Sequence, residues 1–102
     1  MENPKYTKAI KELATNGITI MKVFGNSMTP ILYSGSILTF KRCDDGYEIG
    51  DIVFCRVNSR YIDAHKITSK NEQRGYFISN NHGHDNGWTR RIFGKVVKIE
   101  KP

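Results

Sequence analysis

Near the start of the chain, apolar residues recur at intervals of three and four, which is the spacing of one helix face. These residues are Tyr6, Ala9, Ile10, Leu13 and Ala14. Lysines occupy the opposite face, and Asn16-Gly17 is a helix stop. The pattern predicts a helix over residues 5–15 that covers an edge or face of the remaining domain. A single short helix of this kind is not a helix-turn-helix DNA reader.

From Ile18 onward, the pattern changes to short runs rich in Ile, Val, Phe and Tyr, separated by Gly, Asn, Asp and Ser turns. These runs predict strands at residues 18–24, 36–42, 51–57, 60–67, 75–80 and 91–99. The tight connection Asn58-Ser59 predicts that the third and fourth strands pair as a hairpin. We therefore expect a mainly β fold, in which an N-terminal helix within residues 1–17 packs on a small β domain spanning residues 18–102.

The length of the chain sets the outer limits of the fold. A chain of 102 residues, 38% of them hydrophobic, is large enough for one globular domain with a modest core. Its longest apolar runs are far shorter than the roughly 18 to 20 residues that cross a bilayer. The first residues contain no continuous apolar stretch that would act as a secretory signal. We expect a cytoplasmic protein without membrane contact.

The formal net charge of +6 raises the question of a nucleic-acid partner. The lysines and arginines are spread along the whole chain, which is typical of a solvated surface. Aromatic residues interleave with them, as single-strand binding requires, but they occupy positions that core packing also explains: Tyr61, Tyr76, Phe77 and Trp88. Nucleic acid is therefore the less favoured partner, and an acidic protein is an equal alternative to it.

The cysteines and histidines do not indicate a metal ion or another cofactor. Cys55 lies in an apolar run and is expected to pack as a small hydrophobic side chain, and Cys43 adjoins a turn. We expect both thiols to be reduced. His82, His84 and Asp85 form a pattern that can wrap a divalent ion, but a second ligand pair at regular spacing is absent from the sequence. We interpret this segment as a polar loop.

The strongest chemical signal is the turn Gly25-Asn26-Ser27-Met28-Thr29-Pro30, which lies between two apolar runs. Such a turn can hold the Ser27 hydroxyl clear of a sheet. A serine needs a nearby base to take its proton, and about forty residues later the segment Asp63-Ala64-His65-Lys66-Ile67 supplies one. A histidine with its ordinary pKa is largely neutral at pH 7 and can accept that proton. Ser27 and His65 are therefore the predicted nucleophile and general base.

The order of segments around this pair resembles the superfamily that holds the type I signal peptidases and the self-cleaving LexA and phage-repressor domains. The resemblance covers roughly residues 18 to 99. The matching elements are the run GNSMTPILYSG, the segment Gly50-Asp51-Ile52-Val53, the segment Ala64-His65-Lys66-Ile67, and a strand, Asn-rich loop and strand between Gly75 and Val97. In this superfamily the base is a lysine in some members and a histidine in others. The resemblance implies that His65 takes the place of the base, that Lys66 matches the basic residue after it, and that the domain is a small coiled β-sheet.

The sequence departs from the superfamily in the loop after the fourth element. Many signal peptidases have Gly-Asp-Asn there, whereas this chain has Asn80-Asn81 followed by His82-Gly83-His84-Asp85-Asn86. The carboxylate that the superfamily has at the position of Asn81 is missing. Two alternatives stay open: Asp85 orients His65 as the third member of a triad, or Ser27 and His65 act as a dyad.

The resemblance also implies roles for neighbouring residues and two classes of function. Met28 and Pro30 are expected to shape the turn and the wall of a substrate groove, in which a peptide lies extended beside a strand. The first class is a serine endopeptidase that acts on other chains, because the self-cleavage site of the repressors has no clear counterpart before Ser27. The second class is a binding or regulatory module without turnover, in a phage or mobile-element protein that binds a host factor or forms a homodimer.

Overall fold

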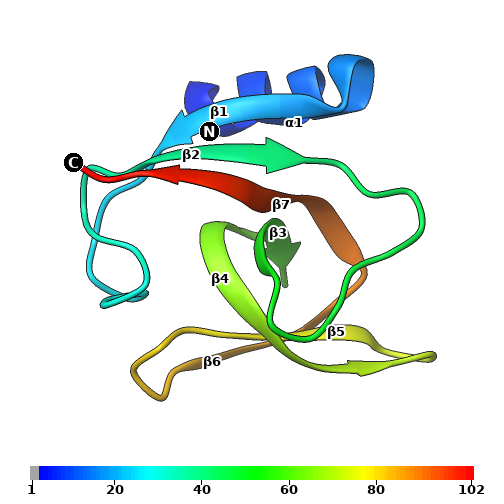
Figure 1. Ribbon diagram of the computed structural model, residues 1–102. Coiled ribbons are helices and arrows are strands. Elements are labelled where there is room, and N and C mark those ends of the chain that lie inside the picture. Colours follow the sequence, from blue (N-terminus) through cyan, green and yellow to red (C-terminus); the bar gives the residue numbers. More distant parts are fainter. Residues whose placement is uncertain (1–2) are drawn as a thin grey trace.

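The computed structural model describes residues 3–102, which form one helix and seven strands. The helix is α1 (Pro4–Asn16), and the strands are β1 (Ile18–Lys22), β2 (Ile37–Lys41), β3 (Ile52–Val57), β4 (Arg60–Asn71), β5 (Gly75–Ser79), β6 (Asp85–Thr89) and β7 (Arg91–Glu100). The expected mainly β fold with one N-terminal helix is confirmed (Figure 1). The difference is β6, because the sequence predicted a loop in that segment.

Both ends of α1 are fixed by local hydrogen bonds. The side chain of Asn3 accepts a hydrogen bond from the backbone N–H of Lys5, at 2.9 Å. At the other end, Gly17 adopts a φ of 77° and its N–H donates to the carbonyl of Leu13. The guanidinium of Arg42 donates to the same carbonyl at 3.1 Å. The helix therefore stops where the sequence predicted, and a side chain that follows β2 helps to cap it.

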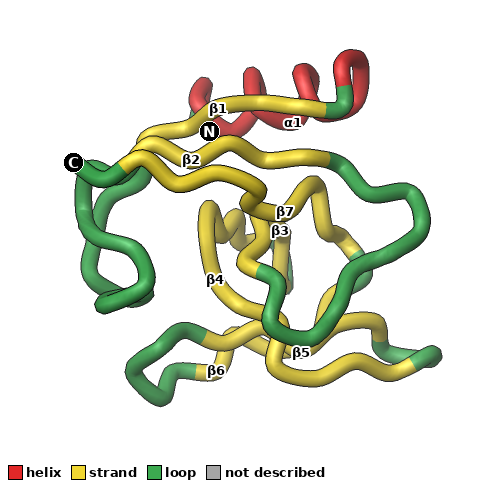
Figure 2. Tube along the Cα trace, viewed as in Figure 1, coloured by secondary structure: helices red, strands yellow, loops and turns green. Residues whose placement is uncertain are grey.

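All seven strands join one antiparallel sheet, in the order β1-β2-β7-β3-β4-β5-β6. The sheet is coiled, so that β1, β2 and β7 lie beside α1 while β5 and β6 lie at the opposite end of the molecule (Figure 1). Asn58 and Ser59 have positive φ angles of 48° and 70° in the turn between β3 and β4, as a two-residue hairpin requires. Figure 2 shows that the β1–β2 loop and the β5–β6 loop project on the same side.

The core consists of two adjoining hydrophobic clusters. The first joins α1 to the sheet and contains Ala9, Leu13, Met21, Val23, Met28, Leu32, Leu38, Phe40, Phe54 and Ala64. The second lies between the remaining strands and contains Tyr47, Val53, Cys55, Val57, Ile62, Ile67 and Ile78. No helix within residues 3–102 is long and apolar enough to cross a membrane. The cytoplasmic location expected from the sequence stays a prediction.

Candidate active site

Ser27 lies at the tip of the loop that joins β1 to β2. The base of this loop is closed by a hydrogen bond from the N–H of Val23 to the carbonyl of Ser36, at 2.9 Å. The tip is anchored by Met28 and Leu32, whose side chains are buried in the first core cluster. Because these two side chains point inward, Ser27 is held at the surface, where it is half-buried.

The structure brings Ser27 and His65 together and adds Asn86 behind them. The Oγ of Ser27 lies 3.1 Å from Nε2 of His65, and Nδ1 of the same ring lies 2.6 Å from Oδ1 of Asn86. An amide oxygen only accepts hydrogen bonds, so the ring hydrogen belongs on Nδ1. Nε2 then carries a lone pair and accepts a hydrogen bond from the hydroxyl of Ser27. This arrangement is the hydrogen-bond chain that an activated serine needs.

A β-bulge places Asn86 against the histidine. In the β5–β6 pair, Ile78 lies opposite Gly87 and Ser79 lies opposite Asp85. Asn86 between them is the extra residue, without a partner in the ladder. Bulges of this kind bend a strand and redirect a side chain, and they are frequent beside active sites. The bulge therefore accounts for the position of the amide.

The sequence left open whether Asp85 orients His65 or Ser27 and His65 act as a dyad, and the side chain hydrogen-bonded to Nδ1 of His65 is that of Asn86, not Asp85. The carboxylate of Asp85 instead accepts a hydrogen bond from the hydroxyl of Ser79, at 2.9 Å. The position behind the histidine belongs to the next residue along, Asn86. The sequence could have indicated Asn86, because an asparagine can also orient a histidine, as in the Cys-His-Asn proteases.

The loop between β5 and β6 supports the serine turn. The N–H of Asn81 donates to the carbonyl of Ser27 at 2.9 Å, and its side-chain amide donates to the carbonyl of Met28 at 3.3 Å. His82 Nε2 lies 2.9 Å from the hydroxyl of Thr29. The sequence analysis noted Asn81 only as the position of a missing carboxylate. In the structure, its two hydrogen bonds hold the serine turn against the loop that precedes β6.

Met28 and Pro30 lie in different surroundings on the serine turn, and their expected role at the wall of a substrate groove stays a prediction. Met28 is only 3% exposed, so it serves the core, although it also borders the narrow cavity beside Ser27. Pro30 is exposed on the turn and lines neither of the two cavities that flank the site. Within residues 3–102, the backbone N–H groups of Ser27 and Met28 donate to no protein acceptor.

Burial lowers the pKa of His65 below its usual value, because the protein disfavours the charged ring. The hydrogen bond to Asn86 and the negative charge of Asp63 act in the opposite direction, and His84 adds to the lowering. Since burial dominates, the ring is neutral at pH 7. Neutral imidazole is the form that accepts a proton from a serine.

Two cavities flank the pair. A groove of about 220 Å³ borders His65 and Asn86, and its other lining residues come mostly from β4: Arg60, Tyr61, Ile62, Asp63 and His84. A much narrower space of about 10 Å³ lies beside Ser27 and is lined in part by Phe24, Asp63 and Ala64. The two cavities share Asp63. Only the groove beside His65 is large enough to hold a side chain, because the space beside Ser27 has about the volume of one water molecule.

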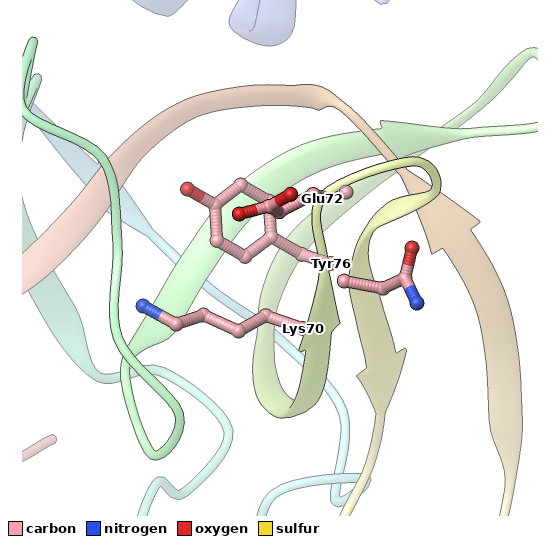
Figure 3. A pocket seen from close by; sticks show the side chains of 5 residues that line it. Lys70, Glu72 and Tyr76 are labelled. Carbon is pink, nitrogen blue, oxygen red and sulfur yellow. The ribbon is translucent and has the colours of Figure 1, made fainter.

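A further cavity, of about 400 Å³, is separate from this site. It lies at the β4–β5 hairpin, where Figure 3 shows Lys70, Glu72 and Tyr76 around it. The ammonium of Lys70 is paired with Glu48, and the hydroxyl of Tyr76 accepts a hydrogen bond from the backbone of Tyr47. The lining holds no nucleophile next to a base, so we do not place catalysis there.

The cysteines and the remaining histidines do not form a second reactive site. Burial raises the pKa of Cys55 to about 12, so its thiol is inert as a nucleophile. Cys43 is a half-buried free thiol. His82, His84 and Asp85 do not converge, and within residues 3–102 no three metal-ligating side chains gather into a site.

One comparison with known proteins bears on the same segments. A search of curated proteins gave no match. A family model described as Peptidase S24-like matches residues 2–97, which include the serine turn, the β4 histidine and the whole sheet up to β7. The match covers nearly the entire chain and agrees with the LexA and signal-peptidase resemblance read from the sequence. The chain belongs to the Peptidase S24-like family.

Proposed function

We propose that this protein is a serine endopeptidase in which Ser27 is the nucleophile, His65 is the general base and Asn86 positions the histidine. The observation that carries the proposal is the 3.1 Å contact between the Ser27 hydroxyl and His65 Nε2, on a ring whose other nitrogen is bound to Asn86. A general base must lie within hydrogen-bond reach of the proton that it removes, and this one does.

The reaction follows from these positions. The Ser27 oxygen attacks the carbonyl carbon of a peptide bond while its proton passes to Nε2 of His65. The tetrahedral intermediate collapses, the C–N bond breaks, and the leaving amine takes the proton from Nε2. A water molecule then attacks the ester on Ser27, again giving its proton to His65, and the released serine oxygen recovers that proton. The products are a new carboxylic acid and a new amine.

The negative oxygen of the intermediate needs donors in a fixed place. The backbone N–H groups of Ser27 and Met28 are free to donate, and the turn that carries them is held by the core and by Asn81. A peptide substrate would lie in the groove along β4, where its carbonyl can reach both the hydroxyl and these donors. The substrate is accordingly a protein or peptide segment in an extended conformation.

The test is labelling by a fluorophosphonate probe, which reacts with an activated serine without requiring a known substrate. We expect the wild type to be labelled and Ser27→Ala and His65→Ala to lose the label. Ser69→Ala removes a half-buried serine of β4 outside the site and should label like the wild type. Circular dichroism establishes that each variant is folded. A folded wild type that is not labelled would refute the proposal and favour a binding module of the same fold.

A further inference from the structure

A cation from the chain itself is bound beside the proposed active site. The ammonium of Lys5, in the first turn of α1, lies 3.6 Å from a carboxylate oxygen of Asp63 on β4. It also lies 5.6 Å from the ring centroids of both Tyr6 and Phe24. A carboxylate next to aromatic faces is a favourable site for an ammonium or guanidinium group.

Asp63 is placed where a substrate would meet it. It lies two residues before His65 on the same strand, and it lines both cavities that flank Ser27 and His65. Among the described residues 3–102 that line these cavities, it is the one carboxylate. Its charge also acts on His65, whose pKa it raises against the larger effect of burial. A charged group on a bound peptide near the scissile bond would therefore interact with Asp63.

Phe24 forms the other side of this cation site. It precedes the serine turn, borders the narrow cavity beside Ser27 and is 66% exposed, which is unusual for a large aromatic side chain. Neither Asp63 nor Lys5 is deeply buried, since their side chains are 25% and 31% exposed. The pair is long, at 3.6 Å, and both side chains reach solvent, so another cation can compete with Lys5 for Asp63.

We propose that Asp63 and Phe24 form a specificity site for a lysine or arginine side chain within three residues of the scissile bond, and that Lys5 occupies this site when no substrate is bound. The proposal rests on the peptidase function proposed above and adds the class of substrate. Lys5 then competes with the basic side chain of a substrate for Asp63, and removing the Lys5 side chain leaves the Asp63 carboxylate open to that substrate.

The experiment uses a pool of extended peptides in which each of the three positions on either side of the central bond carries Lys, Ala or Glu. Cleavage is followed by mass spectrometry, and the readout is the ratio of rates for Lys-containing and Ala-containing peptides. A ratio is needed because Asp63 also acts on His65. We expect the wild type to favour Lys at one position, and Asp63→Asn to reduce this preference by about three- to tenfold. Phe24→Ala should reduce it in the same direction.

Lys5 gives an independent test with a matched control. Lys5→Ala should speed cleavage of the Lys-containing peptides, whereas Lys8→Ala, on the same helix and of the same charge, should leave the rate unchanged. Lys5→Ala keeps the proposal testable if the Asp63 variant does not fold. A preference for Glu would instead point to Arg60, the positive charge that lines the larger groove.

The outcomes separate this inference from the function on which it rests. If the folded wild type is not labelled by the fluorophosphonate probe, the proposed peptidase function itself is refuted. A wild type that is labelled but cleaves Lys and Ala peptides equally, prefers Glu, or cleaves no Lys-containing peptide overturns the specificity site alone. A Lys preference that persists in Asp63→Asn also overturns it.

Discussion

Replacing Asn86 by alanine tests whether the bulge in β6 serves the chemistry or only the fold. The change removes the oxygen that lies 2.6 Å from Nδ1 of His65 and leaves Ser27 and the ring in place. Without that acceptor, the ring can rotate or carry its hydrogen on Nε2, where it cannot take a proton from the serine. The variant should therefore retain the nucleophile and lose much of its activation.

The magnitude follows from the strength of the lost hydrogen bond. A hydrogen bond at a partly buried site contributes about 1–3 kcal/mol when its partner is left unpaired or charged. Because each 1.4 kcal/mol changes a rate about tenfold, fluorophosphonate labelling of Asn86→Ala should be about 5- to 150-fold slower than that of the wild type. Water that replaces the amide oxygen would bring the effect toward the lower limit.

The assay is the pseudo-first-order rate of labelling at fixed probe concentration, with thermal denaturation of the same samples as the measure of folding. Asn86→Asp is the conservative control, because it returns an acceptor oxygen to the same position. A folded Asn86→Ala variant that is labelled within twofold of the wild-type rate would refute the assignment of Asn86 as the positioning residue. The site would then work as a dyad.

The pH profile separates a positioning role from a structural one. Labelling requires the neutral ring, so it increases as the pH rises through the pKa of His65, which burial lowers in the wild type. A carboxylate in Asn86→Asp stabilises the charged ring and should move the midpoint of the profile to higher pH. Asn86→Ala removes a bond that raises the pKa of His65 and should move the midpoint to lower pH. Identical midpoints in all three proteins would contradict the contact.

Three further changes test the hydrophobic core, the β4–β5 hairpin and the support of the serine turn. Phe54→Ala should lower the free energy of unfolding by about 3–5 kcal/mol in urea denaturation, because the ring is fully buried; a loss below 1 kcal/mol would contradict the core described above. Gly75→Ala should cost about 2 kcal/mol or more, since a Cβ there would lie 2.4 Å from the carbonyl of Thr89 at a φ of 91°. The matched control Gly83→Ala has φ 81° but open space around it, so it should cost only about 1–2 kcal/mol; equal losses would refute the steric argument. Asn81→Ala should slow labelling by about fivefold through the lost donor to the serine turn, with little change in thermal stability, and an unchanged labelling rate would remove that role.

The helix and most strands could be predicted because each carries its own local signal. The stop at Asn16-Gly17 works through the left-handed conformation of Gly17, which a glycine adopts readily and which is therefore visible in the local sequence. The tight turn at Asn58-Ser59 likewise sets the β3–β4 hairpin without help from distant residues. In both cases the residues that fix the geometry are adjacent in sequence, so pattern reasoning can find them.

The strand β6 could not be predicted in this way because its sequence, Asp85 to Thr89, contains one large apolar residue and a glycine. Its stability comes from pairing with β5, where the ring of Trp88 meets that of Phe77 at 5.2 Å. The two segments together supply the apolar contact that neither supplies alone. A strand held mainly by its neighbour leaves little trace in its own sequence.

The contact of His65 with Asn86 rather than Asp85 also depends on the pairing of β5 with β6. It sets which kind of side chain, an amide or a carboxylate, lies next to the ring. Consecutive residues of a strand point to opposite faces, so a shift of one residue reverses which side chain faces the histidine. A single-residue bulge opposite Ser79 makes that shift here. The consequence is an amide rather than a carboxylate behind His65, and an amide supplies orientation without a compensating negative charge. Burial therefore lowers the pKa of His65 without a carboxylate at that position to offset it, which favours the neutral ring that the proposed mechanism requires, and Asn86→Asp should raise this pKa.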